Sequence, residues 1–294
     1  MTAEAGVTKS AVARNFSAAA GSYRSVNNLQ QVVAGRLLER MEYMTLSPGR
    51  VLDMGSGPGT SAVLLQKTFP KTGIIEMDLS HGMLLESRRG DRRFFRRRSR
   101  VCGDAEQTAL RTSSVDIVFS SLMLQWCNDP DSVFTEVARI LKPNGLFIFS
   151  SFGPDTLKEL RESWRAVDEG EHVNTFLDMH DVGDGLMRCG FQNPVLESEY
   201  IDYRYDEAHG LMRDLKQLGA QNSNRERRKS LTGKKRMQSM LCEYEKYRHE
   251  GKLPVTYEIV YGHAWKAPLE LAKKSGENVA TFSLEALKGS VPRK

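Results

Sequence analysis

Apolar residues along the chain fall into short runs rich in strand formers, which alternate with stretches where apolar positions recur at helical spacing. Strands are predicted at 50–54, 73–77, 115–120 and 146–152, with helices between them at 60–69 and 131–141. A short strand is also expected just before Gly103. Strands that alternate with helices at this interval predict an α/β fold with a parallel, doubly wound sheet.

The pattern changes on either side of this core. A leading helix is predicted at 25–44, and beyond residue 152 we predict helices at 155–167 and 178–189, strands at 194–205 and 256–263, and a mostly helical stretch at 206–250. Because the helical stretch interrupts two strands, we interpret it as a lid inserted over the sheet. We assign residues 1–266 to one domain and 267–294 to a weakly packed tail.

Composition restricts the class of protein only broadly. The 294 residues are 40% hydrophobic and 27% charged, which is ordinary for a globular protein. No apolar run approaches the roughly 20 residues that a membrane helix needs, and no secretory signal is apparent at the N-terminus. The four scattered cysteines lack the spacing of zinc ligands, so we expect no metal site, reduced and mostly buried thiols, and a cytoplasmic location.

Basic residues are distributed unevenly, although the net charge is only +5. Eight arginines occur between residues 88 and 100, and a second basic run spans 225–236. Like charges at this density repel one another unless an anion or an acidic partner lies nearby. Each run is therefore either a partner-binding surface or a solvated loop, and the sequence leaves both interpretations open.

Three glycines, Gly55, Gly57 and Gly59, follow the first predicted strand and precede its helix. Glycine is required where a chain turns sharply and where a ligand must approach the backbone without meeting a Cβ atom. Their G-x-G-x-G spacing differs from the G-x-G-x-x-G of dinucleotide-binding loops. A tight turn without a ligand could also use such glycines, but their place between a strand and a helix favours a cofactor loop.

An acidic residue closes the second strand, about 20 residues beyond the glycines. At this position Asp78 can accept hydrogen bonds from both hydroxyls of a ribose, and its charge would disfavour a 2′-phosphate. Glu76 is a second candidate, which lies on the same face of the strand but farther from the loop. We therefore predict Asp78 as the ribose ligand.

The loop from Asp53 to Gly59 resembles motif I of the class I methyltransferases, whose sheet is Rossmann-like. The resemblance implies S-adenosylmethionine as the cofactor, with Asp53 supporting the loop or the cofactor's amino group. It also implies that Asp104, after the third strand, contacts the adenine. The expected cofactor-binding residues are Asp53, Gly55, Ser56, Gly57, Gly59, Asp78, Leu79, Asp104, Ala105 and Ser120.

The segment from Ser120 to Trp126 resembles motif IV of the same family, which faces the methyl group and the substrate. Trp126 is therefore a candidate for the substrate site. A core position would suit this tryptophan equally well, and the sequence does not choose between the two.

Segments outside this core resemble one narrower family, the malonyl-acyl-carrier-protein O-methyltransferases of biotin synthesis. These segments are Val12 to Tyr23, Leu29-Gln30, Leu79 to Leu84, Leu124 to Trp126, Phe152 to Leu160, Leu215 to Asn222 and Thr256 to Gly262. The resemblance covers residues 10–265 and leaves out the tail. The chain departs from the family in its dense arginine run and at Arg24, where an aspartate is common.

This resemblance implies methyl transfer to the free carboxylate of malonyl-acyl carrier protein. A carboxylate is ionised at neutral pH, so it needs no general base, and catalysis would come from alignment and exclusion of water. We expect Tyr23, on a helix that caps the cofactor, to shape the methyl site, and Arg213 in the lid to pair with the substrate carboxylate. The basic runs would then face the acidic carrier protein.

Other functions remain open from the sequence alone. A nucleic-acid methyltransferase would also use basic runs, but no base-flipping or RNA-binding motif accompanies them. A methyltransferase-fold assembly factor or protein arginine hydroxylase could keep the same loop. A carboxyl methyltransferase could also act on a free acid or on a coenzyme A thioester.

Overall fold

The computed structural model describes residues 6–90, 98–224 and 232–268. Its strands are β1 (Arg50–Met54), β2 (Gly73–Asp78), β3 (Arg98–Cys102), β4 (Val115–Ser121), β5 (Leu141–Phe152), β6 (Phe191–Tyr205) and β7 (Leu253–Lys266). Its helices are α1 (Lys9–Val26), α2 (Asn28–Met41), α3 (Thr60–Thr68), α4 (His81–Arg89), α5 (Pro130–Ile140), α6 (Lys158–Arg165), α7 (Met179–Arg188), α8 (Ala208–Gln217) and α9 (Lys234–Glu245), with a 3-10 turn η1 (Leu124–Trp126).

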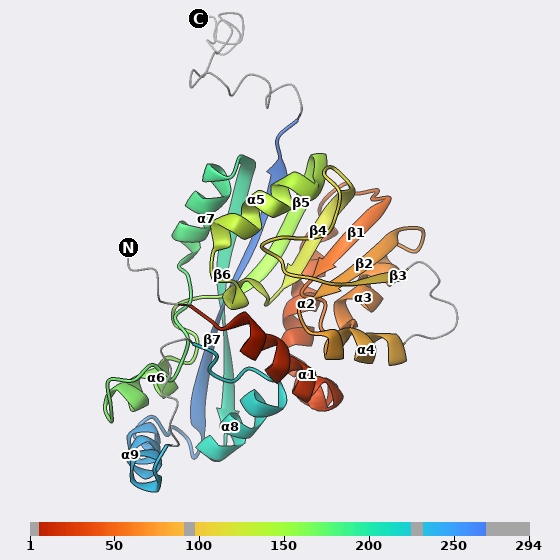
Figure 1. The fold of residues 1–294 in the computed structure, drawn as a ribbon. Coiled ribbons are helices and arrows are strands. Elements are labelled where there is room, and N and C mark those ends of the chain that lie inside the picture. Colours follow the sequence, from red (N-terminus) through yellow and green to blue (C-terminus); the bar gives the residue numbers. More distant parts are fainter. Residues whose placement is uncertain (1–5, 91–97, 225–231, 269–294) are drawn as a thin grey trace, which may run out of the picture.

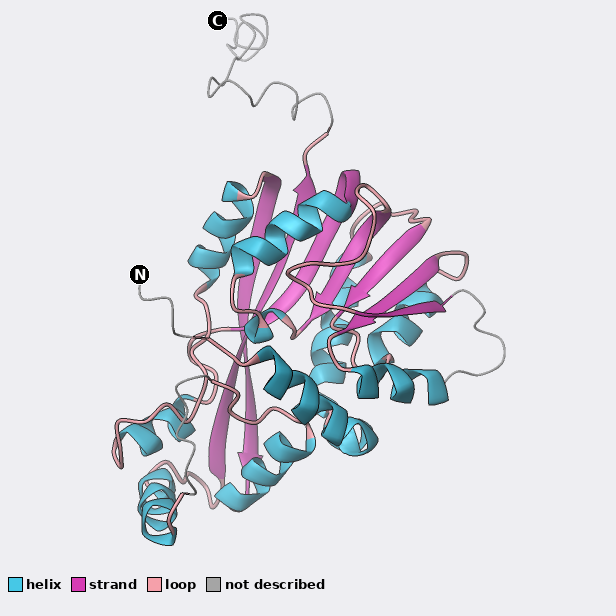
Figure 2. Cartoon of the chain, viewed as in Figure 1, coloured by secondary structure: helices cyan, strands magenta, loops and turns pink. Residues whose placement is uncertain are grey.

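The strands form a single sheet in the order β3-β2-β1-β4-β5-β7-β6. Only β7 runs antiparallel to its neighbours β5 and β6, while the other neighbouring strands of the described chain are parallel. Helices α2 and α3 lie on one face of the sheet, and α5 and α7 lie on the other (Figures 1 and 2). The predicted α/β class and parallel core are confirmed.

Each face of the sheet carries its own apolar core. In β5, Ile148 packs into the core on the side of α2 and α3, whereas its neighbours Phe147 and Phe149 pack on the side of α5 and α7. The same alternation places Val51 on the first side and Leu52 on the second. Burial on both faces explains why these strands read as continuous apolar runs rather than as alternating ones.

The predicted core strands and the two helices between them are confirmed, but the leading helix differs. In place of one helix over 25–44, the structure has two helices, α1 and α2, which are separated at Asn27. Asn27 is buried, and its Oδ1 accepts a hydrogen bond from Gln31 Nε2 at 2.6 Å, which stabilises the first turn of α2. Helix α4, after β2, is not among the predicted elements.

Strands β6 and β7 extend beyond the edge at which the parallel strands end, and they carry a helical layer with them (Figure 1). The chain between them forms α8 and α9, as predicted for the insertion at 206–250. Helix α6 joins this layer from outside the insertion, because it packs against α9 and because Glu162 accepts a hydrogen bond from the Tyr247 hydroxyl at 2.6 Å. The residues of the predicted tail from 269 onward lie outside the described residues.

Part of the arginine run is internal to the fold rather than a surface. Arg98 in β3 has a side chain that is 1% exposed, and its Nε donates to Glu76 Oε1 at 2.8 Å. Arg100 lies 3.2 Å from the same oxygen, and the Ser87 hydroxyl donates to the other oxygen of Glu76. Residues 91–97 of this run and 225–231 of the second basic run lie outside the described residues.

The structure bears on two further features, the state of the cysteines and the presence of membrane-spanning helices. The four cysteines are free, but two of them are exposed and two only partly buried, so the prediction that most are buried is wrong. Among the described residues, no helix combines the length and the apolar character that crossing a membrane requires.

The buried Glu76–Arg98 pair leads to a prediction about stability. Replacing Arg98 with Met leaves the Glu76 carboxylate without this partner in the interior, so we expect the free energy of unfolding to fall by roughly 3–5 kcal/mol. The matched control is Arg188→Met, because Arg188 pairs with Asp131 on the surface, where such a pair contributes roughly 0–1 kcal/mol. Urea denaturation measures both, and equal losses in the two variants would contradict the prediction.

Candidate active site

The glycine loop between β1 and α3 has the backbone conformation that its sequence suggested. Gly55, Gly57 and Gly59 have φ values of +77°, +53° and +78°, in the left-handed region that disfavours other residues. A Cβ atom at Gly55 would collide with the Met123 side chain, whereas no atom lies within 4 Å of a Cβ built at Gly57. A Cβ atom at Gly59 would meet Ser87 and Glu76, so the loop packs tightly at both ends and presents bare backbone to open space in the middle.

Asp78, at the end of β2, holds the loop in this conformation. Its Oδ2 accepts a hydrogen bond from Gly57 N at 2.8 Å, and its Oδ1 accepts one from Ser80 N at 2.7 Å. Burial raises the pKa of the Asp78 carboxyl to about 6, although these two N–H groups lower it. Glu76, the other candidate for this position, is committed to Arg98, and its carboxylate packs against Gly59 rather than lining the cavity described below.

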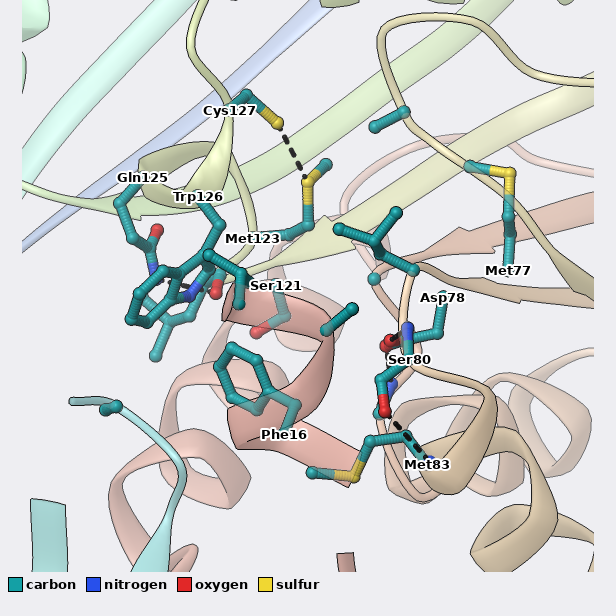
Figure 3. Close-up of a pocket in the computed structure, with 18 of the residues that line it drawn as sticks. Phe16, Met77, Asp78, Ser80, Met83, Ser121, Met123, Gln125, Trp126 and Cys127 are labelled. Carbon is teal, nitrogen blue, oxygen red and sulfur yellow. Dashed lines mark hydrogen bonds between the residues drawn. The ribbon is translucent and has the colours of Figure 1, made fainter. Parts of the chain in front are cut away.

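A cavity opens beside the loop at the carboxyl ends of the parallel strands. Eight of the residues predicted to bind cofactor or substrate line it, namely Tyr23, Gly55, Gly57, Asp78, Leu79, Asp104, Ala105 and Trp126. Figure 3 shows Phe16 and Trp126 on one side of this cavity and Asp78 and Ser80 on the other. The Phe16 and Trp126 rings meet edge to face, with their centroids 5.1 Å apart.

Three further predicted residues, Asp53, Ser56 and Ser120, are not among the residues that line this cavity. Each is buried and has a side-chain oxygen without a hydrogen-bond partner among the described residues. Burial, and then the charge of Glu76, raises the pKa of the Asp53 carboxyl well above its usual range. Buried polar atoms are normally paired, so these oxygens mark a place where the chain alone does not complete its hydrogen bonding.

Helix α1 covers the cavity and is attached to the ends of three strands. Lys9 lies 2.5 Å from Asp104 Oδ2 and 2.6 Å from Glu106 Oε2, after β3. Arg24 donates to the carbonyl oxygen of Pro58, in the glycine loop, at 2.7 Å. The hydroxyls of Ser17 and Ser80 are 2.8 Å apart, beyond the end of β2. Arg24, which stands where an aspartate is common in the similar family, thus connects the covering helix directly to the loop.

Sequence reasoning did not single out Lys9, and no signal in its neighbourhood identifies it. A lysine in the first turn of a helix is usually solvated, and only the tertiary structure brings it to Asp104. Tyr23, on the same helix, lines the cavity. Burial and the nearby charge of Asp78 raise the pKa of its hydroxyl, so that the phenol remains protonated at neutral pH.

A second cavity lies next to the first and extends under the helical layer, with a volume of about 470 Å³. Its wall is built from segments that are far apart in the sequence, including the region after β5, helix α8, the loop that follows α8, and β7. Trp126 lines both cavities, so its side chain is available to ligands. The described residues contain no cluster of three His, Cys, Asp or Glu side chains that could hold a metal ion.

The structure does not bring Arg213 to either cavity. Its side chain is exposed on the outer face of α8, together with His209 and Lys216, whereas Asp214 and Leu215 face the second cavity. The predicted pairing of Arg213 with a substrate carboxylate is therefore corrected, because one step along a helix rotates a side chain by about 100°. This basic outer face suits an acidic macromolecule better than a buried small anion.

Comparison with solved structures agrees with the fold. The YcgJ protein from Bacillus subtilis superposes with a TM-score of 0.58, at 16% identity, over 80% of this chain and 98% of that one. A putative methyltransferase of Haloferax volcanii, solved with its activator Trm112, gives a TM-score of 0.55 at 20% identity, over 86% and 97% of the two chains. At these identities the likeness shows the fold alone.

Comparison of the sequence is more specific. A methyltransferase domain model matches residues 52–149. The malonyl-[acyl-carrier protein] O-methyltransferase of Methylovorus sp. is 43% identical over 96% of this chain and 97% of that protein. The protein of the same name from Gallionella capsiferriformans is 44% identical, over 95% and 98%. The chain belongs to the malonyl-[acyl-carrier protein] O-methyltransferase family of class I methyltransferases.

Proposed function

We propose that this protein transfers a methyl group from S-adenosylmethionine to the free carboxylate of malonyl-acyl carrier protein, as a step in biotin synthesis. A carboxylate oxygen forms the new C–O bond while the C–S bond to the methyl group breaks. The products are a malonyl methyl ester and S-adenosylhomocysteine, and no proton is transferred. A cytoplasmic location is part of this proposal, and the four free cysteines are consistent with a reducing compartment.

One observation carries the proposal: the segments that resemble the malonyl-acyl-carrier-protein methyltransferases line the second cavity. The segment from the end of β5 into α6 contributes Phe152, Thr156, Leu157 and Leu160. Helix α8 and the loop after it contribute Leu215, Leu218, Ala220 and Asn222, and β7 contributes Tyr257. Segments outside a shared catalytic core determine which substrate is bound. Their convergence on one wall next to the glycine loop supports a malonyl substrate there.

The residues of the first cavity fit the cofactor. Asp78 lines this cavity and would accept hydrogen bonds from the ribose hydroxyls, and the bare backbone at Gly57 leaves room for the amino-acid part. The unpartnered oxygens of Asp53, Ser56 and Ser120 lie near the glycine loop and could reach the cofactor's amino group through water. When bound, S-adenosylmethionine supplies an electrophilic methyl group on a positively charged sulfur.

The chain's own contribution to the chemistry is alignment and exclusion of water. The substrate carboxylate is already ionised at neutral pH, so no side chain has to remove a proton. Helix α1 covers the cavity with Phe16 and Tyr23, and Trp126 closes the side opposite Asp78. Removing water from the carboxylate and fixing its direction of attack both favour the transfer.

The structure weakens one argument for a nucleic-acid substrate. The hypothesis of a nucleic-acid methyltransferase depended on the dense arginine run. In the structure, however, Arg98 is buried and Arg100 shares its partner Glu76. Neither side chain is available to neutralise phosphates, so the run has a partly structural explanation.

The direct test supplies methyl-labelled S-adenosylmethionine with malonyl-acyl carrier protein, and offers acetyl-acyl carrier protein, malonyl-coenzyme A and bulk RNA in parallel. We expect base-labile label on the malonyl carrier protein and none on the acetyl form, which lacks a free carboxylate. Label on RNA, or on coenzyme A in strong preference to the carrier protein, would contradict the proposal.

Asp78 leads to a prediction about pH. Only the ionised carboxylate can accept hydrogen bonds from both ribose hydroxyls. Because the pKa of Asp78 is about 6, this carboxylate becomes protonated as the pH falls below 6. We expect the Kd for S-adenosylhomocysteine to rise about tenfold between pH 7 and pH 5. In Asp78→Asn we expect weaker binding at pH 7 and little dependence on pH. Calorimetry measures both, with exposed Asp131→Asn as the control, and an unchanged pH profile in Asp78→Asn would exclude this assignment.

Tyr23 leads to a prediction about turnover. If its hydroxyl shapes the methyl site, Tyr23→Phe should lower kcat by about tenfold to a hundredfold, because a small loss of alignment has effects of that size. The affinity for S-adenosylhomocysteine should change little, since the ring is retained. Tyr43→Phe is the matched control, because Tyr43 is 93% exposed. Full turnover in Tyr23→Phe would refute the role.

A further inference from the structure

The two cavities share part of their lining, and this shared wall is the place where a substrate carboxylate would meet a cofactor methyl group. The residues that line both are Gln30, Gln125, Trp126, Phe152, Leu218 and Ala220. None of them carries a charge. The junction between the cavities is therefore formed, within the described residues, by two amides, an indole and apolar side chains.

The ionisable groups elsewhere in the second cavity are already engaged. Arg204 pairs with Glu250 at 2.8 Å, and His172 lies 2.8 Å from Asp168. Asp214 accepts a hydrogen bond from the Tyr205 hydroxyl at 2.9 Å. In the first cavity Lys9 is held by Asp104 and Glu106. The lining described for the two cavities thus offers a substrate carboxylate no cation that lacks a carboxylate partner.

The two amides at the junction differ in their hydrogen bonding. Gln125 is fixed, because its Nε2 donates to the carbonyl oxygen of Leu122 at 2.6 Å and its Oε1 accepts from Ser151 at 3.5 Å. Gln30, on α2, has a buried Oε1 that accepts no hydrogen bond from the described residues. The two ends of an amide differ little in shape, so a half turn of this side chain would present its NH2 group at the same place.

A neutral junction suits the charge change of the reaction. The carboxylate is negative and the sulfonium positive before transfer, and both charges disappear as the ester and thioether form. A cation beside the carboxylate would therefore stabilise the bound substrate more than the transition state and would slow the transfer. A neutral amide donor can also orient the carboxylate. It stabilises the bound substrate less than a cation does, because its hydrogen bonds are weaker than charge-assisted ones, and it therefore slows the transfer less.

We propose that Gln30 is the residue that orients the malonyl carboxylate, donating from its amide to the oxygen that does not attack; this inference rests on the function proposed above. Trp126 and Phe152 shield the attacking oxygen from water at the same wall. Gln30 touches the substrate but takes no proton, and it selects an acyl group that ends in a carboxylate over one that ends in a methyl group.

Two nearly isosteric variants and one control test the inference. Gln30→Leu removes the donor, Gln30→Glu replaces it with a negative charge, and Gln238→Leu alters an exposed amide on α9 that lines neither cavity. For each we would measure kcat and KM with malonyl-acyl carrier protein, the Kd for S-adenosylhomocysteine and the Tm.

We expect Gln30→Leu to lower kcat/KM by about tenfold to a hundredfold through lost alignment. The Kd for S-adenosylhomocysteine should stay within about twofold, and the Tm should not fall, because an apolar group replaces a buried amide that lacks a partner. Gln30→Glu should lose more activity, since two carboxylates repel. Gln238→Leu should retain the wild-type kcat/KM.

Wild-type kcat/KM in Gln30→Leu would overturn the inference while leaving the proposed function intact. A loss of activity matched by a lower Tm or a weaker affinity for S-adenosylhomocysteine would overturn it as well, because it would reveal a structural role. A wild-type protein that does not methylate malonyl-acyl carrier protein would overturn the proposed function and this inference with it.

Discussion

The two hydrogen bonds that the Asp78 carboxylate accepts, from Gly57 N and from Ser80 N, connect the glycine loop after β1 to the turn after β2. The start of the same loop is held as well, because Gly55 N and Ser56 N donate to the carbonyl oxygen of Met77. With the loop in place, bare backbone faces the cavity, α3 begins at Thr60, and α1 can rest on the carbonyl oxygen of Pro58 through Arg24. The glycine loop and the helix that covers the cavity are thus both positioned relative to the end of β2.

The electrostatics of the two cavities are arranged for different tasks. The first has the carboxylates of Asp78 and Asp104 in its lining, which suits the hydroxyl and amino groups of a nucleoside with an amino-acid arm. The junction is neutral, and Lys9, Arg204 and His172 each contact a carboxylate that lies outside it. A reaction that destroys a pair of opposite charges benefits from such a neutral site, since the transition state is less polar than the bound reactants. The site therefore needs neither a general base nor a free cation.

The interpretation of charged residues was the least reliable part of the sequence reasoning. Arg98 was counted in a basic run that suggested a surface, yet its side chain is buried against Glu76, two residues before Asp78. Arg213 was expected in the site, yet it faces outward from α8 while Asp214 faces inward. Charge is a local property of the sequence, whereas its partner is chosen by the packing of distant strands and helices.

The sequence by itself determined the order of strands and helices, the glycine loop with Asp78 at the end of the next strand, and the family. These features depend on local spacing and backbone conformation, which a linear pattern records. Only the tertiary structure decided that Lys9 meets Asp104, that Arg24 holds the loop, and that Gln30 and Trp126 share a wall between two cavities. These contacts join residues that are far apart in the chain, and such contacts arise only when the elements pack.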